Sequence, residues 1–363
     1  MENILEKIPV TNNLFHVLTN DVKESAKAAG LVYVASTDPG FSRIRRGKKF
    51  IYMNGGEELT DKEHLDRISR LVIPPAWENI WICKIPDGHI QATGYDKKSR
   101  KQYRYHNLWI EFRNKTKFYR LKEFGERLPL TRQNLEKDLS LKGFPQNKVL
   151  AAMISLLERI NIRVGNLFYE KLYGSFGLTT LKNHHVKING SKLHLMFRGK
   201  KGILHNITLS SKKLAKIIQG CKEIPGKELF EYYDEEGNIC VVDSGMLNDY
   251  IRKVSESDFT AKDFRTWAGT VTALLAFKTV GHFSTVTDMN KKVPEALDIV
   301  AKHLGNTRAV CRKYYVHPLI LDLYQSNQLD KYLNELNDIE LENEDSDGYV
   351  AEERILLKIL GNT

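Results

Sequence analysis

The chain has 363 residues. A single hydrophobic core rarely supports a chain of this length, so we expect at least two domains. Hydrophobic residues make up 42% and charged residues 28%, a composition that excludes a disordered or fibrous protein. No apolar run is long enough to cross a membrane, and the first nine residues lack the apolar core of a signal peptide. We therefore expect a cytoplasmic protein without a membrane partner.

The formal net charge is +10, and it is distributed unevenly. Residues 95–122 hold ten basic and two acidic residues, interleaved with aromatic side chains such as Tyr103 and Tyr105. This mixture suits contacts with phosphates and bases, and it favours nucleic-acid binding. A solvated basic face is the alternative interpretation. Residues 334–363 hold nine acidic and two basic residues and are predicted to be an acidic tail, whose segment from Asn334 to Glu353 is expected to be mobile.

The first part of the chain has the pattern of short strands broken by turns. Strands are predicted over 31–36, 49–54, 79–86 and 89–96, with a helix near 60–70. We therefore expect a small β-rich domain over residues 1–107.

From Trp109 onward the apolar residues recur at helical spacing. Helices are predicted over 145–162, 243–254, 260–278 and 293–304, the third beginning with a capping box of Thr260 and Asp263. Asn189-Gly190 predicts a hairpin, and a turn at 198–202 leads into a third strand. The fold class is therefore α+β, with a mostly helical domain over 108–333 that carries a β-hairpin insert, followed by the acidic tail 334–363.

Several cofactor motifs are missing from the sequence. It contains no phosphate-binding P-loop, no dinucleotide fingerprint and no HExxH zinc motif. The four cysteines lie far apart, without the spacing of a zinc site or a disulfide framework. We expect no cofactor.

Polar residues at turns and helix ends form an ordered set in the helical domain. They are Arg163 in RVGN, Lys200 in FRGKKG, Arg265 in KDFRT, and Asn306 with Tyr315 in GNTRAVCRKYY. In this order the chain resembles the type IB DNA topoisomerases, and most of all their short poxviral and bacterial branch. The resemblance runs from about residue 30 to about residue 325, and it includes RLVIPPAW at 70–77 and RKQYRYH at 100–106.

These residue types suit the exchange of one phosphodiester for another. A tyrosine is a possible nucleophile, but with a pKa of about 10 only roughly a thousandth of it is ionised at pH 7, so nearby cations must favour the phenolate. Arg163 and Arg265 could grip the non-bridging oxygens in bidentate fashion. Lys200 could protonate the leaving oxygen as general acid, and Asn306 could donate an amide hydrogen to phosphate.

Each assignment has an alternative. Tyr314 competes with Tyr315, but Tyr315 lies nine residues after Asn306, which is the spacing of the family it resembles. Lys201 competes with Lys200, which fits the aromatic-x-Gly-Lys pattern of that family. Arg163 could instead close a helix C-terminus, and Arg265 could be a surface charge in a first helical turn.

The resemblance implies further properties. It implies an enzyme, independent of ATP and metal, that closes as a monomeric clamp around double-stranded DNA in the bacterial nucleoid, cuts one strand through a 3′-phosphotyrosyl bond and rejoins it. Asn306, where poxviral and nuclear members carry histidine, favours the bacterial branch. The residues that match or flank DNA-facing positions of the family are Lys98, Arg100, Lys101, Gln102, Tyr103, Tyr105, Tyr169 and Lys262. Core packing is the alternative for the face that Tyr103 and Tyr105 share.

Two other functions remain open from the sequence. A tyrosine recombinase uses a similar helical domain, but it would be expected to carry histidine in place of the lysine of KDFRT, and HxxR before the second arginine. A basic DNA-binding protein without activity is the other alternative.

Overall fold

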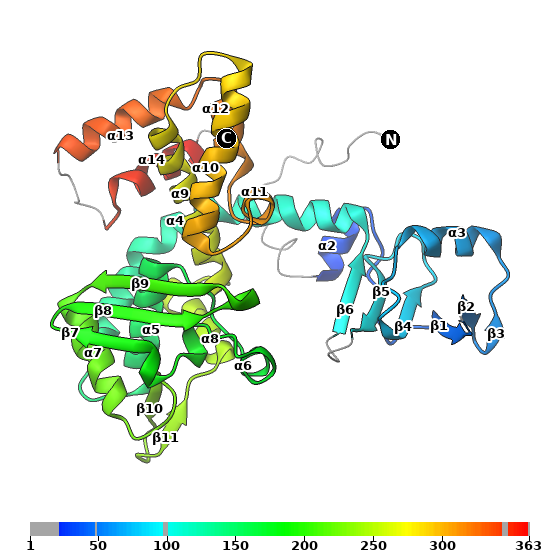
Figure 1. The fold of residues 1–363 in the computed structure, drawn as a ribbon, viewed down its shortest axis with the longest axis horizontal. Helices are drawn as coiled ribbons and strands as arrows, with labels where there is room; N and C mark the ends of the chain where they lie inside the picture. The colour runs from blue at the N-terminus through cyan, green and yellow to red at the C-terminus, as the bar shows by residue number, and fades with distance from the viewer. Residues whose placement is uncertain (1–21, 48, 97–100, 343–347, 362–363) are drawn as a thin grey trace. The chain divides into compact units, whose positions relative to one another are not determined.

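The computed structural model describes residues 22–47, 49–96, 101–342 and 348–361. The chain forms two compact units, Met1–Lys117 and Phe118–Thr363 (Figure 1). Their boundary falls inside the long helix α4 (Asn107–Leu139), ten residues beyond the boundary expected at residue 107. Lys98 and Arg100 lie outside the described residues.

The smaller unit is built on one antiparallel sheet of six strands in the order β3-β2-β1-β4-β5-β6. The strands are β1 (Gly40–Arg46), β2 (Lys49–Asn54), β3 (Glu57–Glu58), β4 (Glu78–Cys83), β5 (Ile90–Tyr95) and β6 (Lys101–Tyr105). The strand predicted over 31–36 is wrong, because only Val32 pairs there, in an isolated bridge to Gly88. β1 was missed by sequence reasoning.

Helix α3 (Lys62–Arg70) packs on this sheet, as expected for a helix near 60–70. Asp61 caps it by accepting a hydrogen bond from the backbone nitrogen of His64 at 3.1 Å. Its buried Ile68 joins Phe41 and Ile82 in the core of the unit. The short helix α2 (Val22–Ala28) precedes the sheet.

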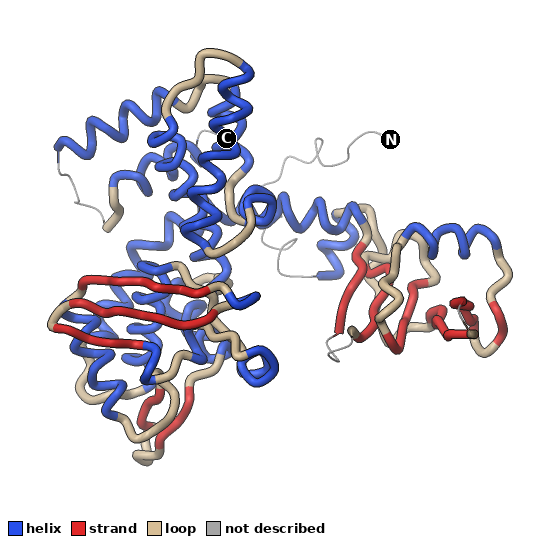
Figure 2. The backbone as a smooth tube through the Cα atoms, in the orientation of Figure 1, coloured by secondary structure: helices blue, strands red, loops and turns tan. Residues whose placement is uncertain are grey.

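The larger unit is mostly helical (Figure 2), and the whole chain has the α+β composition that the sequence predicts. Besides the C-terminal half of α4, its helices up to residue 325 are α5 (Gln146–Ile160), α6 (Leu167–Tyr173), α7 (Lys212–Glu223), α8 (Ser244–Ser255), α9 (Ala261–Val280), α10 (Val286–Leu304), α11 (Arg308–Tyr314) and α12 (Pro318–Gln325). Among the described residues, no helix is long and apolar enough to cross a membrane.

The predicted hairpin insert is confirmed. Strands β7 (Val186–Asn189), β8 (Lys192–Arg198) and β9 (Leu204–Ser210) form a three-stranded antiparallel sheet, and Asn189 pairs with Lys192 across the first turn. A separate pair, β10 (Glu231–Tyr233) and β11 (Ile239–Val241), was not predicted.

Local capping signals set the ends of the two helices that carry the site. The capping box of Thr260 and Asp263 begins α9 as predicted. Helix α10 begins at Val286, earlier than the predicted residue 293, because the hydroxyl of Thr285 caps it by accepting from the nitrogen of Asp288. Gly305 ends α10 in the left-handed conformation, with φ of 59°.

The prediction that residues 334–353 of the acidic tail are mobile is wrong for the described part of this segment, most of which belongs to two helices. Residues 334–342 are part of α13 (Asp330–Glu342), and the tail ends in α14 (Ala351–Gly361), which packs against α9. Apolar residues at helical spacing in α14 are buried, Leu356 and Ile359 among them. Buried Glu353 accepts hydrogen bonds from Arg132 and from the indole nitrogen of Trp267. The acidic composition of this segment concealed an amphipathic helix.

Candidate active site

Helix α9 buries the second of the two predicted arginines. Arg265 is 4% exposed, so it is not the surface charge that was the alternative. Its guanidinium donates to the carbonyl of Asn161, at the end of α5, and to the carbonyl of Leu304, at the end of α10, at 2.9 Å. Burial lowers the pKa of this guanidinium, the charge of Tyr315 raises it, and the charge of Arg163 lowers it. Two helix ends therefore fix Arg265 in place.

Tyr315 lies against the same helix. The guanidinium carbon of Arg265 is 5.2 Å from the centre of the Tyr315 ring, within range of a cation–π contact. The Thr270 hydroxyl donates to the Tyr315 carbonyl at 3.2 Å, and a Cβ on Gly269 would lie only 2.5 Å from that oxygen. Glycine at position 269 therefore allows the end of α11 to approach α9 closely.

Arg163 and Asn306 form a second contact. Asn306 follows the C-cap Gly305, and its side-chain oxygen accepts a hydrogen bond from Arg163. Arg163 also donates to the Gly305 carbonyl at 3.3 Å. It therefore does cap a helix C-terminus, that of α10, which was the alternative interpretation of this residue. The left-handed turn at Gly305 thus directs Asn306 toward Arg163.

His205 on β9 was missed by sequence reasoning. A Cβ on Gly305 would lie 3.1 Å from its ring, and one on Gly199 would lie 2.6 Å from it, so the ring fills the space between these glycines. Burial lowers the pKa of His205, and the charges of Arg163 and Arg265 lower it further, so a neutral imidazole is favoured. Nothing in the spacing around His205 marked it in the sequence.

Lys200 lies in the turn that follows Gly199, and Gly199 lies against the ring of His205. Residues Lys200–Gly202 form a short 3-10 turn between β8 and β9, directly after Gly199. In the described part of the chain, its exposed ammonium makes no hydrogen bond or ion pair. Lys201 occupies the left-handed region, with φ of 63°. The turn therefore lies next to the site, and the Lys200 side chain is exposed at its edge.

Two buried donors at the site lack a partner among the described residues. They are the side-chain nitrogen of Asn306 and Nε of Arg265. An unpaired buried donor is costly, and an anion is an acceptor that would satisfy such a donor. Four of the five predicted residues, Arg163, Arg265, Asn306 and Tyr315, therefore meet in a cationic group suited to a phosphodiester.

Tyr314 is placed differently from Tyr315. The ammonium of Lys313 lies 5.5 Å from the centre of its ring. Arg308, which precedes both tyrosines in α11, is paired with Asp298 on the surface, with Nε 2.7 Å from the carboxylate. The cation over the ring of Tyr315 is thus Arg265, which is 50 residues away in the sequence, and not one of the adjacent basic residues.

The predicted DNA-binding residues of the smaller unit that the structure describes lie on β6. Tyr103 and Tyr105 are 43% and 39% exposed, and their rings stack 5.7 Å apart, which excludes core packing of this face. Lys101 lies beside them, with its ammonium 5.7 Å from the Tyr103 ring. The amide of Gln102 donates to Asp96 at 3.0 Å. Two stacked aromatic rings next to a lysine form a surface suited to nucleic acid.

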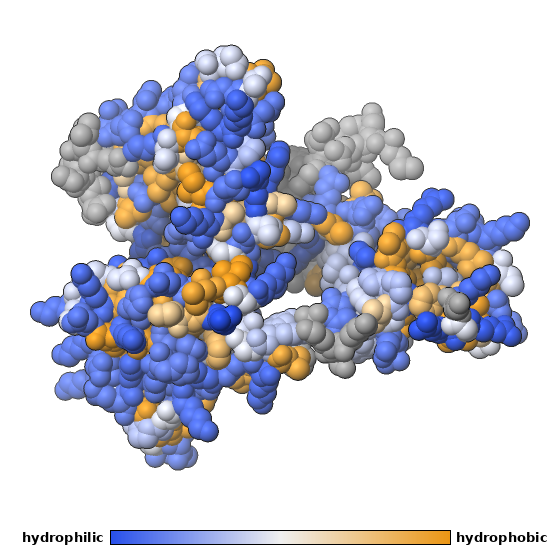
Figure 3. Space-filling model, in the orientation of Figure 1, coloured by the Kyte–Doolittle hydropathy of each residue, from blue (hydrophilic) through white to orange (hydrophobic). Residues whose placement is uncertain are grey.

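Two further candidates lie in the larger unit, whose visible face is mostly hydrophilic (Figure 3). Tyr169 on α6 is 43% exposed and stacks on Tyr173 at 6.0 Å. Lys262 is exposed in the first turn of α9, three residues before Arg265.

Comparison with known proteins shows which family the chain is similar to. The family model described as the catalytic core of eukaryotic DNA topoisomerase I matches residues 100–341, and the N-terminal domain of bacterial DNA topoisomerase IB matches residues 49–96. DNA topoisomerase 1B of Acanthamoeba polyphaga mimivirus is 35% identical over 297 residues, covering 79% of this chain and 88% of the viral protein. The chain belongs to the type IB DNA topoisomerases. The DNA topoisomerase I of Monkeypox virus is 24% identical over 306 residues, covering 77% of this chain and 91% of that protein.

Family membership decides between the functions left open by the sequence. This type IB topoisomerase is an isomerase whose substrate is DNA, and not a tyrosine recombinase. The match to the bacterial N-terminal domain agrees with the bacterial-branch character of Asn306.

Proposed function

We propose that this topoisomerase relaxes supercoiled duplex DNA by transient cleavage of one strand, rotation of the free end and religation. Tyr315 attacks the phosphodiester and forms a 3′-phosphotyrosyl bond, while the 5′-hydroxyl end leaves. The covalent bond conserves the energy needed for religation, so neither ATP nor a metal cofactor is required. The observation that supports this most is the placement of the Arg265 guanidinium over the ring of Tyr315.

In this mechanism the two arginines neutralise the phosphate. The pentacoordinate transition state carries more negative charge on its equatorial oxygens than the ground state, and pre-positioned donors stabilise it selectively. Arg265 is held by two backbone carbonyls, and Arg163 by Asn306 and Gly305, so both guanidiniums are oriented before DNA binds. The unpaired nitrogen of Asn306 would donate to a non-bridging oxygen.

DNA binding by both units is part of the proposal. The stacked Tyr103 and Tyr105, with Lys101 and Gln102, would contact the duplex from the smaller unit. Tyr169 and Lys262 would contact it from the larger unit. We infer a monomer that closes around DNA as a clamp, in the bacterial nucleoid.

The proposed function predicts relaxation without cofactors. The purified protein should relax both positively and negatively supercoiled plasmid in EDTA and without ATP, because rotation about one intact strand has no preferred hand. Gel electrophoresis of topoisomers over time measures this. Relaxation of negative supercoils only, or a strict requirement for magnesium, would contradict the mechanism.

Lys200 is proposed as the general acid for the leaving 5′-oxygen. An alkoxide leaves poorly unless it is protonated, a contribution of about 10²–10⁴-fold, whereas a thiolate with a pKa near 8.5 leaves without help. Lys200→Ala should therefore cleave ordinary DNA slowly, yet cleave a substrate with sulfur at the bridging 5′ position at close to the wild-type rate. Single-turnover cleavage rates on the two substrates test this.

Arg265→Ala and Lys201→Ala are the matched controls. Arg265→Ala should remain slow on both substrates, because charge stabilisation is still missing when sulfur leaves. Lys201→Ala should be close to wild type on both. Rescue of Lys201→Ala but not of Lys200→Ala would exchange the roles of the two lysines.

A further inference from the structure

The guanidinium of Arg265 is held between the ends of two helices. One of its nitrogens donates to the carbonyl of Asn161, the C-cap of α5, and the other donates to the carbonyl of Leu304, the last residue of α10, at 2.9 Å. The direction of the guanidinium therefore depends on how firmly these two carbonyls are held relative to each other. A contact that ties the two helix ends together would fix both carbonyls at once.

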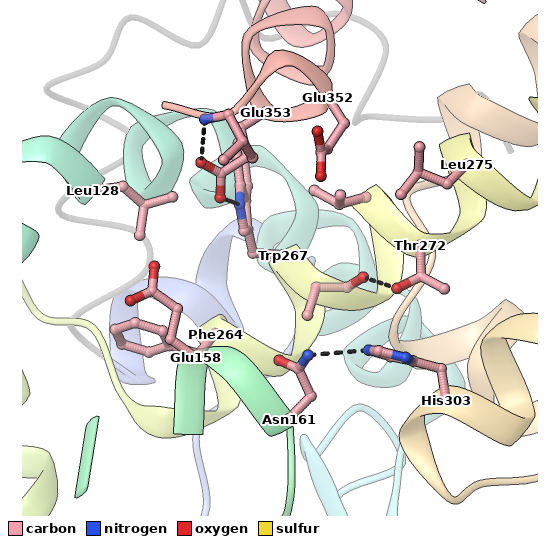
Figure 4. A pocket seen from close by; sticks show the side chains of 13 residues that line it. Leu128, Glu158, Asn161, Phe264, Trp267, Thr272, Leu275, His303, Glu352 and Glu353 are labelled. Carbon is pink, nitrogen blue, oxygen red and sulfur yellow. Dashed lines mark hydrogen bonds between the residues drawn. The ribbon is translucent and has the colours of Figure 1, made fainter. Parts of the chain in front are cut away.

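Such a contact joins the side chains of Asn161 and His303. The amide nitrogen of Asn161 donates to Nε2 of His303 at 3.0 Å (Figure 4). His303 directly precedes Leu304 in the sequence. Arg265 thus connects the two helix ends through their carbonyls, and the Asn161–His303 hydrogen bond connects them a second time through side chains.

The backbone of Asn161 suits this role. It adopts the left-handed conformation, with φ of 52° and ψ of 28°, which asparagine tolerates better than most residues. Its backbone nitrogen donates to the carbonyl of Leu157 at 2.8 Å. The nitrogen of Asn161 therefore ends α5, its carbonyl holds Arg265, and its side chain holds His303.

The hydrogen bond lies at the wall of a cavity of about 210 Å³ in the larger unit, which Asn161 and His303 both line (Figure 4). Because the cavity leaves this side of the pair without packed neighbours, the hydrogen bond has a larger part than steric confinement in setting the positions of the two side chains. Loss of either side chain would therefore release the other.

The neutral form of the His303 ring is favoured. Loss of solvent around the ring lowers its pKa below the usual value of 6.5, and the charge of Arg265 lowers it further. A neutral imidazole has one nitrogen that accepts a hydrogen bond, which is what the amide of Asn161 requires. The charge state of His303 thus agrees with the contact at neutral pH.

We propose that Asn161 and His303 are positioning residues that orient Arg265 toward the scissile phosphate. They hold the ends of α5 and α10 together, so both carbonyl acceptors of Arg265 are in place before DNA binds. Such orientation matters because a misplacement of about 1 Å can cost about a hundredfold in rate. This positioning role rests on the proposed function of Arg265, and it adds two residues that act through that arginine and not on the phosphate itself.

Substitution of His303 tests the proposal. His303 is an exposed residue, so its replacement removes no core packing. His303→Leu should slow single-turnover cleavage by about tenfold to a hundredfold and leave the DNA affinity in a gel-shift titration unchanged, because the contact is lost while phosphate contacts remain. His303→Gln should cleave at close to the wild-type rate, since its amide oxygen lies at about the position of Nε2 and accepts from Asn161.

Glu295→Leu is the matched control. Glu295 is exposed on the same helix, eight residues before His303, and the new side chain is the same. This variant should cleave at the wild-type rate.

Two further measurements show whether the effect passes through Arg265. His303→Leu should be slow on the bridging 5′-sulfur substrate as well, as Arg265→Ala is and Lys200→Ala is not. In the Arg265→Ala background, His303→Leu should cause no further loss, because the group that it positions is gone. Asn161→Gly, which keeps the left-handed turn and the carbonyl but removes the amide, should have the same defect as His303→Leu.

The outcomes separate the positioning role from the proposed function. With Arg265→Ala slow, a wild-type rate for His303→Leu, an equal loss in the Arg265→Ala background, or no recovery in His303→Gln would overturn the positioning role alone. A wild-type rate for Arg265→Ala would contradict the proposed function and the positioning role with it. If His303→Leu unfolds at a lower temperature than the wild type, Asn161→Gly takes its place in the comparisons.

Discussion

Replacing Tyr315 with phenylalanine is expected to abolish DNA relaxation and formation of the covalent adduct while leaving duplex binding intact. The phenol oxygen is the only atom removed, and it is the proposed nucleophile, so the loss should be about 10⁶-fold or more, the scale of enzymatic rate enhancement. Binding rests mainly on phosphate contacts, which the hydroxyl hardly affects. Plasmid relaxation, denaturant-resistant adducts and a gel-shift titration measure the three properties.

Tyr314→Phe is the matched control for this change. Tyr314 is the adjacent residue, and the removed atom is the same, so loss of a general packing or solubility contribution would appear in both variants. We expect Tyr314→Phe to retain relaxation near the wild-type level. A large loss in Tyr314→Phe together with activity in Tyr315→Phe would reverse the assignment.

Deleting the chain after Val350 is expected to unfold the larger unit or to destabilise it strongly. The deletion removes four buried aliphatic side chains of α14, Ile355, Leu356, Ile359 and Leu360. Each contributes about 1.5–3 kcal/mol of burial, so the total is about 6–12 kcal/mol, comparable to the whole stability of a domain. It also leaves Arg132 and the indole of Trp267 without Glu353.

A single substitution gives the same test in a milder form. Leu356→Ala should lower the free energy of unfolding by about 2–5 kcal/mol, measured by urea denaturation. Glu335→Gln, which removes only a surface ion pair with Lys358, should change it by less than about 1 kcal/mol. An unchanged unfolding midpoint after Leu356→Ala or after the deletion would mean that α14 contributes no packing.

Local signals predicted the parts of the fold that depend on neighbouring residues. Asn189-Gly190 marks a turn that only a few residue types adopt, and the Thr260–Asp263 box satisfies free backbone groups within one helical turn. Helix α14 was missed because most of the acidic residues of this segment precede it in the sequence, and their charge dominated the interpretation of the whole segment. Strand β1 was missed because GFSRIRR has the composition of a basic loop. Its extended structure depends on pairing with β2 and β4, which are separate segments that its own sequence does not reveal.

The candidate site shows where sequence reasoning reaches its limit. The order of Arg163, Lys200, Arg265, Asn306 and Tyr315 was visible because each lies in a short motif. The burial of Arg265 and its position over Tyr315 depend on α9, α10 and α11 packing together, which no local pattern encodes. His205 entered the site through the register of β8 and β9, a tertiary property.

Mass mapping of the covalent adduct tests the central claim most directly. The protein is trapped on a duplex that loses its 5′-OH fragment after cleavage, digested with nuclease and protease, and the peptide that retains a nucleotide is sequenced by mass spectrometry. The account predicts a single modified residue, Tyr315, carrying a 3′-phosphate link. A nucleotide on Tyr314 or on any other residue, or a link through the 5′-phosphate, would contradict it.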